Sequence, residues 1–93
     1  MKYSPRPGIV RTTICDLNVL IPSREASGEC HKILQLSFIG AIIWGAIENG
    51  LPTEKAVETL RIIYKRKTKE QIEERIENYC QYLYKNGFVI LSK

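Results

Sequence analysis

The chain has two halves that differ in the spacing of their apolar residues. Up to residue 36 the apolar residues are mostly β-branched and are interrupted by turn formers, which is typical of short strands. From Ser37 onward the apolar residues recur at helical spacing. The pattern therefore predicts an α+β fold in which the strands come first and the helices follow.

Three runs of residues predict N-terminal antiparallel strands. They cover residues 9–15, residues 19–21 and residues 30–36, with a polar connector over residues 23–28. Pro22 ends the second run because proline has no backbone N–H to donate to a neighbouring strand.

The third predicted strand has one apolar side. Cys30, Leu34 and Leu36 share one parity and form the expected core face, although Lys32 falls on the same side. His31, Ile33 and Gln35 belong to the opposite parity. The sequence leaves open which of the two sets directs its backbone N–H groups away from the neighbouring strand.

The first helix is predicted over residues 38–49, with Ser37 as its N-cap. It is apolar on nearly every side, so we expect it to be buried. Gly40 and Gly45 lower its helix propensity, and we expect both glycines to allow close packing. Asn49 and Gly50 supply a left-handed C-cap.

The other two helices are predicted to be amphipathic. Thr53 is the expected N-cap of the second helix, and Thr68 opens the third in a capping box with Gln71. Gly87 ends the third helix, and residues 88–91 favour a short final strand. The whole order resembles a winged helix. The apolar stripes are Ala56, Val57, Leu60, Ile63 and Tyr64 in the second helix and Ile72, Ile76, Tyr79, Cys80 and Leu83 in the third.

Length and composition fit a single domain over residues 1–93. A chain of 93 residues builds one hydrophobic core, and it is too short for a barrel or dinucleotide-binding enzyme. The N-terminus has no apolar segment of the kind that a signal peptide needs. The most apolar stretch, residues 38–47, is about half of the ~20 residues that span a membrane. We therefore expect a cytoplasmic protein with reduced thiols and no membrane partner.

Metal binding and nucleophilic catalysis are both disfavoured by the spacing of the candidate residues. Cys15, Cys30, His31 and Cys80 have the composition of a zinc site, but they lack a paired cysteine knuckle. Cys30 and His31 are adjacent on a predicted strand and so point to opposite faces. We expect no enzyme activity, no catalytic residue, no metal and no cofactor.

A DNA-binding regulator is the alternative function. The net charge of +4 is a mild basic bias, and residues 65–67 form a small basic cluster, although a solvated loop is the commoner meaning of such a cluster. The third helix would enter the DNA groove in a winged helix, and phosphate would repel its acidic residues. We therefore expect no nucleic-acid partner. The acidic residues are Glu70, Glu73, Glu74 and Glu77, against Lys69, Arg75 and Lys85.

Peptide recognition fits the predicted order of elements better. If the third strand lies at a sheet edge, its free N–H and C=O groups can pair with a guest strand. Arg75, Tyr79 and Tyr82 on the third helix fall toward a flanking face that a guest can reach.

The segment LSFIGAIIW (residues 36–44) joins the third predicted strand to the first helix. It is similar to the strand-to-helix junction of the PqqD-like family, usually L-N-x-T-G-x-x-I-W. Residues 48–57, ENGLPTEKAV, resemble its next helix start. Residues 76–89 resemble its closing pattern V-x-x-F-L-x-x-L-x-x-x-G-L-L. The resemblance covers residues 8–91 in the same element order.

The resemblance implies a precursor recognition element for ribosomally made, modified peptides. Such domains bind the precursor's leader segment by strand addition and present it to a modifying enzyme: a leader peptidase with a cyclase in lasso-peptide pathways, or a radical-SAM enzyme. A stand-alone chain suits the lasso and quinone-cofactor types, and we favour the lasso type. By position, the implied peptide-binding residues are Cys30, His31, Lys32, Ile33 and Leu34 through their backbone, and Ile72, Arg75, Ile76 and Tyr79 through their side chains.

The chain departs from the family pattern at the start of the first helix. Ser37 replaces the usual asparagine but can cap a helix equally well. Phe38 and Ile39 replace a usual polar pair, which places apolar bulk at the junction and leaves the leader sequence undefined.

Overall fold

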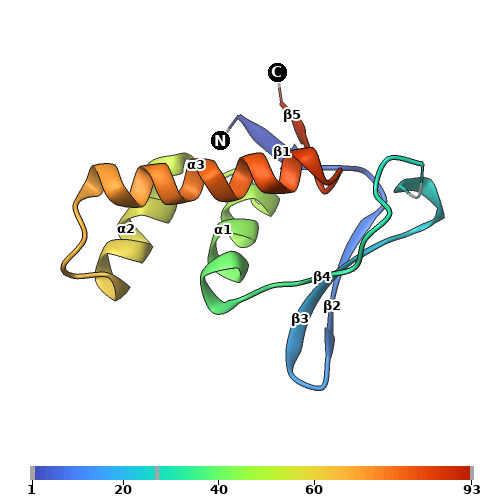
Figure 1. Ribbon diagram of the computed structural model, residues 1–93, viewed down its shortest axis with the longest axis horizontal. Helices are drawn as coiled ribbons and strands as arrows, with labels where there is room; N and C mark the ends of the chain where they lie inside the picture. Colours follow the sequence, from blue (N-terminus) through green and yellow to red (C-terminus); the bar gives the residue numbers. More distant parts are fainter. Residues whose placement is uncertain (1, 27, 93) are drawn as a thin grey trace.

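A three-stranded antiparallel sheet forms the N-terminal half of the computed structural model, which describes residues 2–26 and 28–92 (Figure 1). Its strands are β2 (Ile9–Ile14), β3 (Leu17–Pro22) and β4 (Leu34–Gln35), in that order across the sheet. Since β3 lies in the middle, β2 and β4 are the two edges. The predicted antiparallel arrangement of these three strands is confirmed.

The hairpin between β2 and β3 closes in a two-residue turn. Cys15 and Asp16 both have positive φ, 51° and 65°, and Ile14 pairs directly with Leu17. Positive φ at both central residues is what a type I′ turn requires. The first strand is therefore one residue shorter than predicted, because Cys15 lies in the turn.

The third strand is much shorter than predicted, and Pro22 supplies the reason. The Leu36 N–H donates to the Asn18 carbonyl at 2.8 Å, and Leu34 pairs with Leu20 two residues away. The next bonded pair in this register would join Lys32 to Pro22, which has no N–H to donate. The chain before Leu34 is instead anchored elsewhere, since the Cys30 N–H donates to the Ala26 carbonyl at 2.9 Å. Ala26 ends a 3₁₀ helix, η1 (Arg24–Ala26), within the predicted polar connector.

Three helices follow, as predicted: α1 (Phe38–Glu48), α2 (Thr53–Ile63) and α3 (Lys69–Lys85). The Ser37 side chain accepts the Gly40 N–H, and Thr68 forms the expected capping box with Gln71. The expectation for Thr53 is wrong. Pro52 occupies the N-cap of α2 and makes no side-chain cap bond, while Thr53 is the first helical residue.

The core joins the three helices to the sheet. Leu20 and Leu36 of the sheet region are buried with residues of all three helices, among them Trp44, Leu60 and Ile72. α1 is less completely buried than its composition predicts, because Phe38 at its start is 71% exposed. The whole arrangement is an α+β, winged-helix-like fold.

A second, two-stranded sheet pairs the ends of the chain. β1 (Tyr3–Pro5) runs antiparallel to β5 (Val89–Leu91), so the N-terminal segment lies beside the C-terminal one (Figure 1). The short final strand is confirmed. β1 was not predicted, because three residues ending in proline show no strand periodicity.

Gly87, just after α3, packs closely against residues 29 and 30 of the segment that leads into β4. It has a φ of 84°, and a Cβ there would collide with the Glu29 carbonyl. Glycine is therefore required at this position, both for the backbone conformation and for the close approach of residues 29 and 30.

Candidate functional site

The open edge of β4 presents backbone groups to solvent. Hydrogen bonding alternates along an antiparallel strand, and Leu36 donates toward β3. Leu34 shares that orientation, so the N–H and C=O of Gln35 point away from β3. Ile33 has the same parity as Gln35 but precedes β4, and it is 69% exposed. The structure thus decides the parity that the sequence left open.

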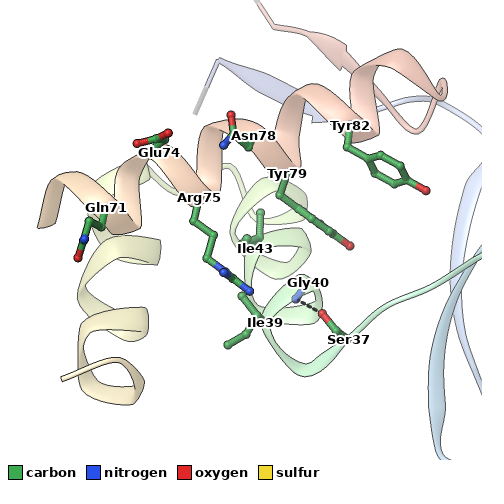
Figure 2. A pocket seen from close by; sticks show the side chains of 10 residues that line it. All are labelled: Ser37, Ile39, Gly40, Ile43, Gln71, Glu74, Arg75, Asn78, Tyr79 and Tyr82. Atoms are coloured by element: carbon green, nitrogen blue, oxygen red, sulfur yellow. Dashed lines mark hydrogen bonds between the residues drawn. The ribbon is translucent and has the colours of Figure 1, made fainter. Parts of the chain in front are cut away.

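A groove of about 560 Å³ lies between the first turn of α1 and the exposed face of α3 (Figure 2). Its walls come from helices on either side, with the chain from β4 entering at Ser37 (Figure 2). The residues that line it are Ser37, Ile39, Gly40 and Ile43 from the α1 side, and Gln71, Glu74, Arg75, Asn78, Tyr79 and Tyr82 from α3.

Tyr79 lies across the start of α1. A Cβ on Gly40 would be 2.5 Å from the Tyr79 hydroxyl oxygen, so only glycine allows the ring to occupy this position without moving. The close packing expected at Gly40 is confirmed. It is not found at Gly45, where a Cβ would meet no atom within 4 Å.

Tyr79 and Tyr82 form an aromatic pair along the groove. Their ring centroids are 6.3 Å apart, with an angle of 29° between the rings. Burial, and then the neighbouring Tyr82, raises the pKa of Tyr79, so its phenol stays protonated at neutral pH. Neither hydroxyl has a hydrogen-bond partner within residues 2–26 and 28–92. The pair therefore offers apolar surface together with two free hydroxyl groups.

Arg75 supplies positive charge to the groove. Its guanidinium carbon lies 5.4 Å from the centroid of the Tyr64 ring. Figure 2 shows the side chain directed toward Ile39, whereas the Glu74 carboxylate points away from the groove. No ion pair of Arg75 occurs in the part of the chain that the structure describes. A carboxylate in the groove would therefore meet an arginine that no acidic residue neutralises.

The predicted site residues fall into three groups. Arg75 and Tyr79 line the groove. His31, Lys32 and Ile33 are exposed in the segment before β4, Leu34 is half-buried in it, and Cys30 is buried. Ile72 and Ile76 lie in the core, 0% and 2% exposed, and contact of their side chains with a guest stays a prediction.

The sequence pattern missed part of the groove. Ser37, Ile39 and Gly40 belong to the motif that carries the family resemblance, but the pattern predicts only a cap and a helix start for them. It assigns Gln35 to the strand face opposite the core and gives it no role. The signal that could have found Gln35 is the position of Pro22, which fixes where the ladder between β3 and β4 ends.

The three cysteines are far from forming one site. Cys15 is exposed in the hairpin turn, whereas Cys30 and Cys80 are buried. Burial raises the pKa of the Cys80 thiol to about 11, which keeps it protonated and unreactive at neutral pH. No group of three potential metal ligands occurs among the described residues. None of the described helices is long and apolar enough to cross a membrane.

The acidic residues of α3 are divided between two sides of the helix. Glu73 and Glu77 border a second hollow of about 320 Å³ next to Lys2 and Tyr3. Glu74 stands at the rim of the groove. Carboxylates therefore flank α3 where a DNA backbone would have to approach a recognition helix.

An open strand edge beside an aromatic groove defines a winged-helix-like domain to which a peptide strand can be added. No family model matches the chain, and no curated protein is similar to it at a significant level. Two solved structures share its fold. One is lasso peptide synthetase B1 complexed with the leader peptide (20% identity, TM-score 0.79), which covers 97% of this chain and 99% of that one. The other is TbiB1 in complex with the TbiA(beta) leader peptide (19% identity, TM-score 0.74), covering 92% of this chain and 93% of that one.

Proposed function

We propose that the chain is a peptide-binding adaptor that captures the leader segment of a ribosomally made precursor and presents it to modifying enzymes. The observation that carries this proposal is the unpaired edge of β4 next to the groove lined by Tyr79 and Tyr82. Two features support it: the fold shared with two proteins solved with leader peptides, and the resemblance to PqqD-like recognition elements.

In this mechanism the guest adds to the sheet as an antiparallel strand. The outward N–H and C=O groups of Gln35 and the backbone of Ile33 bond to the guest's backbone and give affinity with little dependence on sequence. Arg75, Tyr79 and Tyr82 select its side chains. Ordering a flexible peptide costs roughly 2–5 kcal/mol. A groove already fixed by the Gly40–Tyr79 packing reduces the further cost of ordering the protein.

The partner enzyme follows from the same proposal. A domain that only holds a leader needs an enzyme to act on the rest of the precursor. We favour a leader peptidase with a cyclase, as in lasso-peptide pathways, over a radical-SAM enzyme, because one of the solved neighbours is a lasso peptide synthetase B1. This role requires neither a cofactor nor a metal on the chain itself, and it places the protein in the cytoplasm with the precursor.

Two proline substitutions in β4 test strand addition. Peptides selected from a random-sequence display library on the whole chain serve as probes. We expect Gln35→Pro to stay folded and to bind these peptides at least about tenfold more weakly, because it removes one outward donor and obstructs the guest. Leu34→Pro should unfold the domain, since its N–H faces β3. Gln35→Ala is the matched control, because it keeps the N–H and should bind like the parent.

Thermal melts by circular dichroism and peptide titrations by fluorescence anisotropy separate these outcomes. A folded Gln35→Pro variant with the parent's affinity would show that β4 is not the docking edge. If that variant does not fold, amide hydrogen exchange decides instead. The proposal then requires peptide binding to slow exchange of the Gln35 N–H, and unchanged exchange refutes it.

A further inference from the structure

The connection between α2 and α3 carries positive charge without an acidic counterpart. Lys65, Arg66 and Lys67, named here the basic loop, are all exposed. None of them takes part in an ion pair in the described parts of the chain. Lys67 instead places its ammonium group 5.8 Å from the centroid of the Tyr64 ring. The loop is therefore free to bind negative charge from another molecule.

The basic loop adjoins the groove. A hollow of about 580 Å³ is lined by the three residues of the loop together with Ile63, Tyr64 and Gln71. Gln71 also lines the groove. Tyr64 joins the two sites as well, because both Lys67 and Arg75 lie over its ring. A chain that leaves the groove past Arg75 enters the hollow beside the basic loop.

The direction of a guest strand decides which part of it reaches the basic loop. The chain runs from β4 through Ser37 to Ile39, past Tyr82 first and Arg75 later, and so opposite in direction to α3 (Figure 2). A guest antiparallel to β4 therefore runs in the same direction as α3. Its N-terminal flank lies toward Gln71 at the start of α3, and its C-terminal flank lies toward Tyr82.

We propose that the basic loop binds acidic residues in the segment of the guest that precedes its strand-forming part. This inference rests on the proposed function and names the substrate class: peptides with a carboxylate-rich segment N-terminal to an apolar, extended one. Arg75 extends the positive charge into the groove. Of the acidic residues of α3, Glu70 comes closest to the basic loop along the chain, and the Glu74 carboxylate is directed away from the groove (Figure 2).

A peptide fits this surface better than a nucleic acid does. The hollow is a continuation of the groove and is walled in part by Ile63 and Tyr64, which suits an extended peptide. A duplex would need a broad basic surface and would have to cover the exposed face of α3, where Glu70 and Glu74 would repel its phosphates. A single peptide strand lies in the groove, from which the Glu74 carboxylate is directed away (Figure 2).

Selection from the random-sequence display library tests the predicted polarity. On the whole chain we expect enriched peptides to share an apolar, β-prone segment with several aspartates or glutamates on its N-terminal side. The enriched peptide and a copy with those carboxylates replaced by amides then serve as probes. Acidic residues enriched only on the C-terminal side, or on neither side, would overturn the inference.

A matched pair of triple variants tests the loop itself. K65Q/R66Q/K67Q should bind the acidic peptide about tenfold more weakly, because three exposed charge pairs, each of small binding free energy, together account for about that change in affinity. The control K2Q/K55Q/K85Q loses the same net charge elsewhere and should stay within about twofold of the parent. The amidated peptide should bind the parent and the loop variant alike. Equal losses in both triple variants would mean a general charge effect and would refute the loop as a site.

Two further measurements test the direction of the bound peptide and the class of ligand that the basic loop takes. A nitroxide label on the peptide N-terminus should broaden the amide NMR signals of residues 65–67, and a label on its C-terminus should not; the reverse pattern would overturn the inference. A short DNA duplex that binds more tightly than the acidic peptide and is lost in the loop variant would replace the peptide with nucleic acid. Gln35→Pro distinguishes failure of the proposed function from failure of this inference. If Gln35→Pro abolishes peptide binding while the loop variant binds normally, strand addition stands and only the acidic-segment inference fails.

Discussion

The two flanks of α3 have opposite character. On one flank Lys2 and Tyr3 of the N-terminal segment cover the helix, and this flank is called the closed flank. The Tyr3 hydroxyl donates to Glu77 Oε1 at 3.2 Å and accepts from Gln81 Nε2 at 2.9 Å, and Lys2 pairs with Glu77 at 3.3 Å. On the other flank no strand from the described residues is seated against Tyr79 and Tyr82.

This difference indicates which surface is available to a partner. β1 pairs with β5 and brings Tyr3 against α3, so the closed flank already has an intramolecular occupant. The open flank has a strand edge and an aromatic wall but no occupant from the described chain. Substitutions on the closed flank should therefore change stability, and substitutions on the open flank should change peptide binding.

Ile72→Ala has the largest expected effect on stability. Its side chain is fully buried on the core side of α3, so we expect a loss of about 2–5 kcal/mol in the free energy of unfolding. Ile62→Ala on the exposed side of α2 is the matched control and should change stability by no more than about 0.5 kcal/mol. Urea denaturation measures both. A stable Ile72→Ala variant that has lost peptide binding would show that the Ile72 side chain contacts the peptide.

Tyr79→Ala should affect binding more than stability. As an anchor of the groove it should cost about 1–3 kcal/mol of peptide affinity, with a smaller loss of fold stability because the ring is only half-buried. Tyr84→Ala is the control, because Tyr84 lies on the closed flank beside Tyr3, with ring centroids 6.2 Å apart, and so away from the groove. Calorimetric titration beside a thermal melt would show the contrast. A large drop in melting temperature with normal affinity in the folded fraction would assign Tyr79 to the core.

Tyr3→Phe should show the reverse behaviour on the closed flank. It removes the hydroxyl that joins Glu77 and Gln81, and we expect a loss of about 0.5–1.5 kcal/mol in stability. Peptide affinity should not change. Paired urea denaturation and peptide titration measure both quantities. Reduced affinity at unchanged stability would mean that the two flanks are not independent.

Glu77 gives the smallest expected effect, seen as a dependence of stability on pH. Burial alone would raise the pKa of Glu77, but hydrogen bonds from Gln81 and Lys2 and the charge of Lys2 outweigh it and hold the pKa below its usual value. The ionised carboxylate therefore stabilises the fold above the unfolded pKa, and this contribution is lost as pH falls through the lower folded pKa. Because the side chain is 47% exposed, we expect less than about 1 kcal/mol.

Melting curves between neutral and acidic pH would measure this contribution. Glu77→Gln should melt lower than the parent at neutral pH and approach it below the folded pKa. The same difference at every pH would show that the Glu77 charge does not contribute.

Local signals in the sequence were sufficient for the starts of α1 and α3. The Ser37 cap and the capping box at Thr68 depend on neighbouring residues only, and both are confirmed. The exception is Thr53, where the cap belongs to Pro52. Thr53 has a good capping side chain, but the helix can begin at either of two adjacent residues, and the local pattern does not distinguish the two starts.

The candidate site was only partly predictable for a different reason. Helical periodicity placed Tyr79 on the same stripe as Ile72 and Ile76, yet it alone of the three extends into the groove. A small difference in position around the helix decides whether a side chain meets the core or an open flank, and that depends on what packs beside the helix.

By itself the sequence determined the α+β class, the order of the three sheet strands, the three helices and the final strand, and the caps at Ser37 and Thr68, because these follow from periodicity and from hydrogen bonds between near neighbours. Only the tertiary structure decided which flank of α3 is closed by β1, how far β4 extends, and which of its residues face outward. Each of these depends on contacts between segments far apart in the chain: Tyr3 with Glu77, Asn18 with Leu36, and Glu29 with Gly87. Such contacts are fixed by packing and register, which no local pattern of residues contains.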